Sequence, residues 1–100
     1  AANVCAEDDV NNFCACTGTV YYGRKYVSGQ PGSGSTTSLA QLESTAFMTK
    51  AVSGTVSCFV GSFGGVDPLD GYYKYCLCAS AFNILHSVFC SRMYRCAACA

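Results

Sequence analysis

Nine cysteines in a chain of 100 residues constrain the fold more than any other feature of this sequence. A domain this short buries too little apolar surface to be very stable by itself, and disulfide bonds are a common reinforcement. Such bonds persist in secreted or luminal compartments and are rare in the reducing cytosol. We therefore expect a secreted, extracellular or organelle-lumen protein with four intramolecular disulfides and one leftover cysteine, either free or joined to another chain. The disulfide candidates are Cys5, Cys14, Cys16, Cys58, Cys76, Cys78, Cys90, Cys96 and Cys99.

Zinc coordination is the competing interpretation of the cysteines, because tetrahedral zinc sites draw on closely spaced thiolates. The close pairs are Cys14-x-Cys16, Cys76-x-Cys78 and the best zinc candidate, Cys96-x-x-Cys99. On a β-strand, C-x-C spacing places both sulfurs on one face, which suits two parallel cross-strand bridges better than one metal ion. The sequence therefore predicts no metal and no cofactor. It also predicts bonds mostly within the sheet, with at least one bond to the C-terminal cysteines.

Charge is scarce and balanced. Charged residues make up 12% of the chain, and six basic residues against six acidic ones give zero formal net charge. Binding to nucleic acid or to anionic lipid needs a positive surface, so neither partner is expected. No apolar run approaches the length of a membrane-spanning helix, which predicts no membrane insertion. Because the chain starts at Ala1 without a basic and then apolar segment, we expect a mature product whose signal peptide has been removed.

Alternating residue types predict three β-strands, over residues 14–22, 47–60 and 72–78. After residue 78 the apolar period changes to steps of three and four, as in an amphipathic helix. The apolar side of that helix consists of Phe82, Leu85, Phe89, Met93 and Cys96. The predicted fold class is a small disulfide-rich α+β domain, with an antiparallel β-sheet of three or more strands and a C-terminal amphipathic helix.

A single cysteine-rich domain over residues 1–100 is predicted to have three parts. Residues 1–13 form an N-terminal arm, residues 14–78 the β core, and residues 79–100 the C-terminal helix and tail. Within the core, the glycine- and serine-rich segment 28–38 predicts a flexible loop. Ser38 and Gln41 match a capping box that opens a short helix, with a loop as the alternative, and Gly54 is a candidate β-bulge.

Aromatic residues gather on the strand faces opposite the cysteines. If the cysteine-bearing faces meet in a core, the other faces present Tyr21, Phe59, Tyr73 and Tyr75 beside several threonines. Our preferred interpretation is that the C-terminal helix packs over this surface. The functional alternative is an exposed aromatic-threonine face, able to stack on sugar rings or to dock a protein partner.

A wider pattern links these strands. The chain contains C-x-C-x-G-x-V-x-Y-G from Cys14, V-S-G-x-V-x-C from Val52, then Phe63-Gly64, Asp67-Pro68, and K-x-C-x-C from Lys74. This order resembles a small cysteine-rich module that recurs in predicted extracellular proteins of dinoflagellates and other algal protists. Here Gly65-Val66 interrupts the module's usual Phe-Gly-Asp-Pro run. The resemblance covers residues 14–78; it implies an exported β-rich disulfide domain and supplies no catalytic residues.

Catalytic motifs are missing from the sequence, which contains no nucleophile elbow and no H-E-x-x-H. The single histidine, His86, lies on the polar side of the predicted helix, where solvated surface is the default. Asp67 and Asp70 bracket a Pro-Leu turn, and turn capping explains them better than calcium binding.

We therefore expect no enzyme but a non-enzymatic secreted or luminal structural or interaction protein, a component of a larger extracellular or luminal assembly. It would bind a protein partner or self-assemble, with a glycan as a further ligand. The alternative is a carbohydrate-binding module, and a secreted toxin or defence protein is third. A toxin is disfavoured because a neutral chain lacks the cationic surface that attacks membranes.

Overall fold

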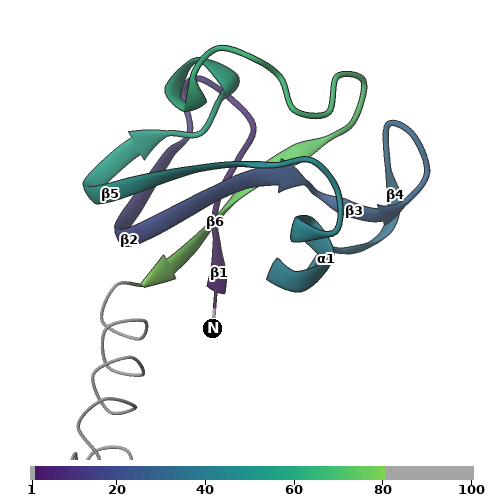
Figure 1. Ribbon diagram of the computed structural model, residues 1–100, viewed down its shortest axis with the longest axis horizontal. Helices are drawn as coiled ribbons and strands as arrows, with labels where there is room; N and C mark the ends of the chain where they lie inside the picture. The colour runs from purple at the N-terminus through teal and green to yellow at the C-terminus, as the bar shows by residue number, and fades with distance from the viewer. Residues whose placement is uncertain (1, 81–100) are drawn as a thin grey trace, which may run out of the picture.

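The computed structural model describes residues 2–80, which form a four-stranded antiparallel sheet and a separate two-stranded hairpin. In the larger sheet the strand order is β1-β6-β2-β5, so the last described strand lies between the first two (Figure 1). In chain order the elements are β1 (Ala2–Glu7), β2 (Phe13–Arg24), β3 (Tyr26–Ser28), β4 (Ser33–Thr36), α1 (Leu39–Glu43), β5 (Met48–Ser57), η1 (Val60–Phe63) and β6 (Lys74–Ser80).

The fold class is confirmed in its coarse form, a small, disulfide-rich and mostly antiparallel β structure. The strands predicted over residues 14–22 and 47–60 correspond to β2 and β5, which pair in one unbroken register. The third strand begins at Lys74 rather than Tyr72, because the Tyr72 N–H closes a turn onto the Leu69 carbonyl (3.1 Å). Residues 79 and 80 extend that strand, and the rest of the predicted C-terminal helix lies outside the described residues.

The N-terminal segment differs from the prediction made from the sequence. Residues 1–13 were expected to form an arm, yet Ala2–Glu7 is strand β1 and pairs with β6 along its length. A register shift between Val4 and Ala6 turns Cys5 toward its disulfide partner Cys14. The acidic residues after Glu7 fall in the following turn, so they do not prevent the preceding residues from joining the sheet.

The glycine- and serine-rich segment also differs from the prediction. Part of the predicted loop over residues 28–38 is a β-hairpin, in which β3 pairs with β4. The turn between them contains a cis peptide bond between Gln30 and Pro31. Gly32 lies against the ring of Tyr26, where an added Cβ would come within 2.9 Å of a ring carbon. The glycine therefore allows the aromatic ring to pack on the hairpin's own backbone.

The predicted capping box and short helix are confirmed. The Gln41 N–H donates to the Ser38 hydroxyl oxygen (3.3 Å), and the Ser38 N–H donates to the Gln41 side-chain oxygen (2.8 Å). Leu42 of this helix is fully buried against β2 at Gly23, where an added Cβ would lie 2.8 Å from the leucine. Burying such a side chain stabilises the fold by about 1.5–3 kcal/mol. Helix α1 thereby covers part of the sheet face opposite the cysteines.

The paired strands β2 and β5 bend over the core. Cys78 faces Val20 in the β2–β6 ladder, yet the Cα atoms of Cys16 and Cys78 lie 5.7 Å apart across a disulfide. Strand β2 therefore bends between Cys16 and Val20, where Gly18 lies. On β5, Gly54 pairs with Cys16 without the predicted bulge. Its φ of +134° explains the glycine, because an added Cβ would meet no atom within 4 Å.

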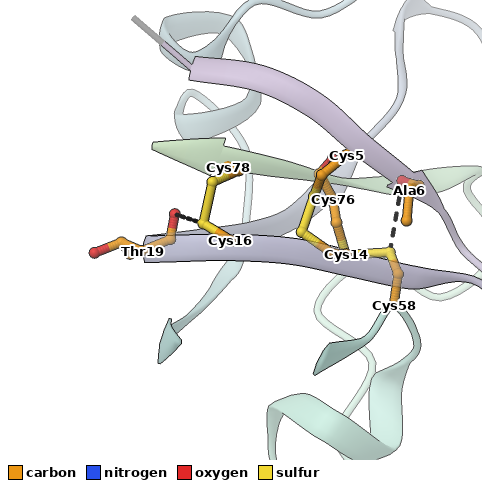
Figure 2. Close-up of a disulfide and its surroundings, with 8 residues drawn as sticks. All are labelled: Cys5, Ala6, Cys14, Cys16, Thr19, Cys58, Cys76 and Cys78. Carbon is orange, nitrogen blue, oxygen red and sulfur yellow. Dashed lines mark hydrogen bonds between the residues drawn. A yellow bond between two sulfur atoms is a disulfide. The ribbon is translucent and has the colours of Figure 1, made fainter. Parts of the chain in front are cut away.

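Three disulfides connect the strands on the inner face of this bend (Figure 2). Their Cα–Cα distances of 4.9, 5.7 and 6.0 Å lie in the usual range for disulfides. The bonded pairs are Cys5–Cys14, Cys16–Cys78 and Cys58–Cys76. The surrounding core consists of Cys14, Cys16, Val20, Tyr22, Val56, Cys58, Phe63 and Cys76. The cysteine-bearing faces therefore meet in the core, as predicted.

Strand β1 lies directly against the Cys58–Cys76 bond. The sulfur of Cys5 is 3.3 Å from the Cys76 carbonyl oxygen, and the sulfur of Cys58 is 3.7 Å from the Ala6 carbonyl oxygen (Figure 2). A disulfide sulfur carries no proton, so both are close sulfur–oxygen contacts rather than hydrogen bonds. These contacts pack β1 onto the sulfur-rich core.

The six cysteines of the described residues are all paired with one another. The prediction of a bond from the sheet to the C-terminal cysteines is therefore wrong, because Cys5 of β1 supplies the additional partner. Cys90, Cys96 and Cys99 lie outside the described residues, and with them the predicted fourth disulfide. Three disulfides within residues 2–80 are typical of proteins from oxidising, extracellular-type environments.

The stabilising effect of the bonds should follow the length of chain that each one closes. The separations are 62 residues for Cys16–Cys78 and 9 residues for Cys5–Cys14, and each bond joins one buried and one partly buried cysteine. By the loop-entropy relation, replacing both cysteines by alanine should cost about 4 kcal/mol for the first pair and about 2.5 kcal/mol for the second. Urea unfolding of the two double variants measures this difference. Equal losses, or a larger loss for the shorter loop, would contradict the entropic explanation.

Candidate functional site

Three segments that are distant in sequence meet at one end of the larger sheet. Because β1 and β2 both run antiparallel to β6, the ends of β1 and β2 lie beside the beginning of β6. The β3–β4 hairpin and α1 follow β2 beyond this same end (Figure 1). The Lys25 N–H donates to the Tyr73 carbonyl (2.9 Å), and the Tyr73 N–H donates to the Pro31 carbonyl (2.8 Å). These bonds fix the hairpin to the segment before β6.

A cleft of about 420 Å³ lies between these segments. This volume is in the range of small-molecule sites, roughly 300–1,000 Å³. Three tyrosines, two lysines and two carboxylates line the cleft, which we call the tyrosine cleft. Its lining residues are Glu7, Asp8, Lys25, Tyr26, Tyr72, Tyr73 and Lys74.

Lys74 is a buried cation that organises the loop beneath the cleft. Its side chain is 4% exposed, and its ammonium lies 3.2 Å from the Asp67 carboxylate. The same ammonium donates to the carbonyls of Leu69 (3.0 Å) and Tyr72 (2.7 Å), so all three of its protons have acceptors. Asp67 also accepts from the Leu69 N–H (2.9 Å), in agreement with its predicted turn-capping role. The ammonium therefore holds the turn that presents Tyr72 and Tyr73.

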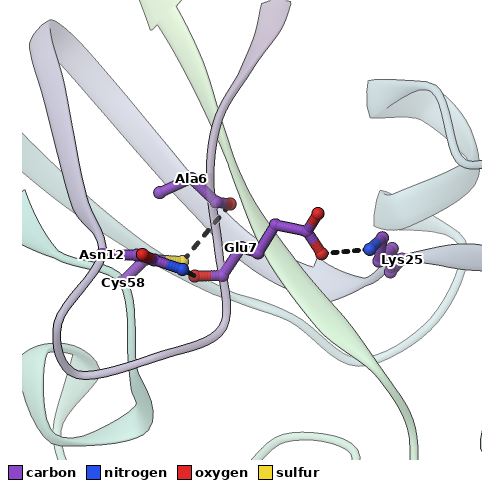
Figure 3. Close-up of polar contacts among 5 residues, drawn as sticks. All are labelled: Ala6, Glu7, Asn12, Lys25 and Cys58. Atoms are coloured by element: carbon purple, nitrogen blue, oxygen red, sulfur yellow. Dashed lines mark hydrogen bonds and ion pairs between the residues drawn. The ribbon is translucent and has the colours of Figure 1, made fainter.

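Lys25 and Glu7 form an ion pair at the cleft (Figure 3). The Lys25 ammonium also lies 5.1 Å from the centroid of the Tyr26 ring, within the range of a cation–π interaction. The hydrogen bond to Glu7 is the main reason that the pKa of Lys25 is raised, and burial partly opposes it. The pair joins the end of β1 to the end of β2 and leaves the glutamate side chain largely exposed.

The tyrosine rings of the cleft stand at an angle to one another. The Tyr26 and Tyr73 rings have centroids 6.1 Å apart and an interplanar angle of 70°. The Arg24 guanidinium lies over Tyr72, 5.2 Å from the ring centroid. Tyr73 is 55% exposed, while the other two tyrosines are partly buried. Tyr73 therefore offers the most accessible aromatic surface.

Tyr22 connects the cleft to the core. Its side chain is almost fully buried, and its ring stacks on Phe63 with centroids 5.0 Å apart. Burial, a hydrogen bond to the Asp8 carboxylate and the negative charges of Asp8 and Asp67 all raise the pKa of Tyr22 well above its usual value. These surroundings favour the neutral phenol in the folded protein.

Both ammonium groups of the cleft are paired within the protein. Its lining contains two carboxylates and two ammonium groups, and both ammonium groups have carboxylate partners. In the part of the chain that the structure describes, no group of three or more His, Cys, Asp or Glu residues is arranged to hold a metal ion. His86 lies outside that part. The cleft offers aromatic surface and hydrogen-bonding groups but no arrangement of a nucleophile beside a general base.

The four residues predicted to form one binding face lie in separate places. Tyr75 is 1% exposed beneath α1, and its hydroxyl donates to the Thr37 carbonyl. Tyr21 packs on Phe47, with ring centroids 6.0 Å apart. Phe59 lies over Gly61, and Tyr73 lines the tyrosine cleft. The predicted platform therefore does not exist as one surface, because α1 and its flanking residues cover the face that contains Tyr75.

Most residues of the cleft were not singled out by the sequence. Glu7 and Asp8 fall in the predicted N-terminal arm, and Lys25, Tyr26 and Tyr72 belong to none of the motifs described above. One signal was available: Arg24-Lys25-Tyr26 and Tyr72-Tyr73-Lys74 both place basic residues beside aromatic ones at a strand end. Such matching ends suggest that the two segments meet.

Replacing Lys74 by alanine should destabilise the protein by about 3 kcal/mol, because the variant leaves Asp67 and two carbonyls without their shared cation. Lys50→Ala is the matched control, since Lys50 is exposed and makes one bond at the surface. Chemical unfolding of both variants at neutral pH gives the comparison. A loss at Lys74 no larger than at Lys50 would show that the buried ammonium does not organise the loop.

Tyr22 should ionise only at a pH well above the usual range of a tyrosine. Because its folded pKa lies above its unfolded value of about 10, its contribution to stability is complete below that pH and is lost as the pH rises further. An alkaline titration followed by tyrosinate absorbance and circular dichroism should show a late step that accompanies unfolding. Tyr22→Phe should lack this step. A full tyrosinate signal from the wild-type protein while it is still folded would count against the buried, Asp8-bonded phenol.

Comparison with known proteins adds no relative to these observations. No family model matches the chain, and no curated protein or solved structure matches it. Within residues 2–80, no helix is long and apolar enough to span a membrane. The similarity of residues 14–78 to the cysteine-rich algal module therefore stays a prediction.

Proposed function

We propose that this chain is a non-enzymatic interaction protein of an extracellular or luminal assembly, and that it binds its partner through the tyrosine cleft. The observation that supports the proposal most directly is the exposed ring of Tyr73 in a cleft whose ammonium groups already have carboxylate partners. Tyrosine is enriched in binding surfaces because its ring is both apolar and able to form hydrogen bonds.

The rigidity of the site supports the same function. Tyr73 is held on both sides by backbone hydrogen bonds, and the Lys74 ammonium fixes the turn before it. A site that is fixed before its ligand arrives loses less conformational entropy on binding. The disulfides that link β1, β2 and β6 hold the strands from which the cleft is built.

The three disulfides support secretion or luminal delivery as part of the proposal. The resemblance to exported algal modules agrees with it. The balanced charge of the whole chain makes nucleic acid and anionic membranes poor partners. A partner would instead be recognised by shape, aromatic contact and hydrogen bonds.

The test is whether the tagged full-length protein is retained on the extracellular or luminal material of the cells that produce it. Retention of Tyr73→Ala should fall about tenfold relative to wild type, as for an aromatic residue at the centre of an interface. Phe13→Ala is the control, because Phe13 is an aromatic side chain of similar exposure at the beginning of β2 and does not line the cleft.

Mass spectrometry of the non-reduced variants checks that their disulfides are intact. Equal retention of wild type and Tyr73→Ala would overturn the proposed role of the cleft. Turnover of a substrate that requires His86 would overturn the non-enzymatic assignment.

A further inference from the structure

We infer that the ligand of the tyrosine cleft is a neutral carbohydrate chain. This inference rests on the proposed function, because it assigns a chemical class to the partner of the same site. Three features of the cleft carry it: the ion pairs of its lysines, the angle between its tyrosine rings, and the hydrogen bonds that its backbone groups already form.

The ion pairs of the cleft disfavour an anionic ligand. Glu7 is bound to Lys25, and Lys74 is bound to Asp67, so neither ammonium is left free for an anionic ligand. An anionic ligand would have to break one of these pairs or lose its hydration without a partner, and either event is unfavourable.

The lining indicates a ligand that combines apolar faces with hydroxyl groups. Tyr26 and Tyr73 form a corner, with 70° between their planes, rather than a slot between parallel rings. A pyranose presents C–H groups on its faces and hydroxyls on its rim, so it can stack on one ring and reach polar groups beside it. Glu7 supplies an exposed acceptor at the cleft, and the tyrosine hydroxyls both donate and accept.

The backbone around the cleft disfavours an extended peptide. Peptides commonly bind by adding a strand to an open sheet edge. Here β6 is paired with both β1 and β2, and the Tyr73 N–H and carbonyl are already bonded to the hairpin and to Lys25. The cleft therefore binds through side chains, which is the usual mode for a sugar stacked on an aromatic ring.

Titration calorimetry of the intact, oxidised protein tests the inference with defined probes. The neutral probes are hexasaccharides of cellulose, xylan, mannan and chitin, and the charged probes are oligogalacturonate and heparin fragments. We expect binding to at least one neutral probe, with an association constant that does not change with salt. Neutral ligands displace no counterions, whereas binding of the charged probes would weaken as salt increases.

Three variants locate the binding. Tyr73→Ala should lower the association constant about tenfold through the loss of the stacking surface, while Tyr73→Phe should retain most of it. Phe13→Ala should bind as wild type does. Neutral binding that is unaffected by Tyr73→Ala, binding restricted to the charged probes, or no binding to any probe would each overturn the inference.

The outcomes separate this inference from the proposed function. Retention that depends on Tyr73, together with no binding to the neutral probes, would reject the carbohydrate ligand and leave the interaction role standing. Retention that is independent of Tyr73 would reject the cleft as the place where the partner binds. In that case, loss of neutral-sugar binding in Tyr73→Ala would still support a carbohydrate site.

Discussion

The pairing of β6 with β1 on one side and β2 on the other determines both the core and the cleft. It brings Cys78 close to its disulfide partner Cys16 on β2, and Cys76 close to its partner Cys58 just after β5. It also places the beginning of β6 beside the ends of β1 and β2, where Tyr73 meets Lys25. A chain with few large aliphatic residues in its core thus uses sulfur bridges to hold a curved sheet together.

The cleft shows how a protein with little charge uses the charge it has. Lys74 and Lys25 both form ion pairs with neighbouring segments. Lys74 does so beneath the cleft, and Lys25 does so at its side. The Lys74 ammonium joins the turn before β6 to that strand, and the Lys25 ammonium joins the end of β1 to the residue that follows β2. The result is a rigid surface with polar groups and no unpaired cation of its own. Recognition then depends on aromatic surface and hydrogen bonding.

The sequence predicted what depends on local pattern and missed what depends on strand order. Alternation predicted β2 and β5, and the capping box at Ser38 predicted α1, because neighbouring residues determine both. The sequence analysis missed β1, because a short strand followed directly by acidic residues looks like an exposed N-terminal arm. The burial of Tyr75 could not be predicted, because Thr37 and Leu42, which cover it, are more than 30 residues away in the sequence. The cleft was missed for the same reason, as its residues come from three separate segments.

The central position of β6 also has a consequence for how the chain matures during synthesis. A protein that enters an oxidising compartment from its N-terminus first presents Cys5, Cys14, Cys16 and Cys58, and only Cys5 and Cys14 are partners of each other. Cys16 and Cys58 must wait for β6, and β1 has no neighbour in the sheet until the same strand emerges. Oxidation that outruns translation would therefore trap Cys16 with Cys58. The native partners of Cys16 and Cys58 both lie in β6, so correct pairing of these two cysteines depends on that strand being present.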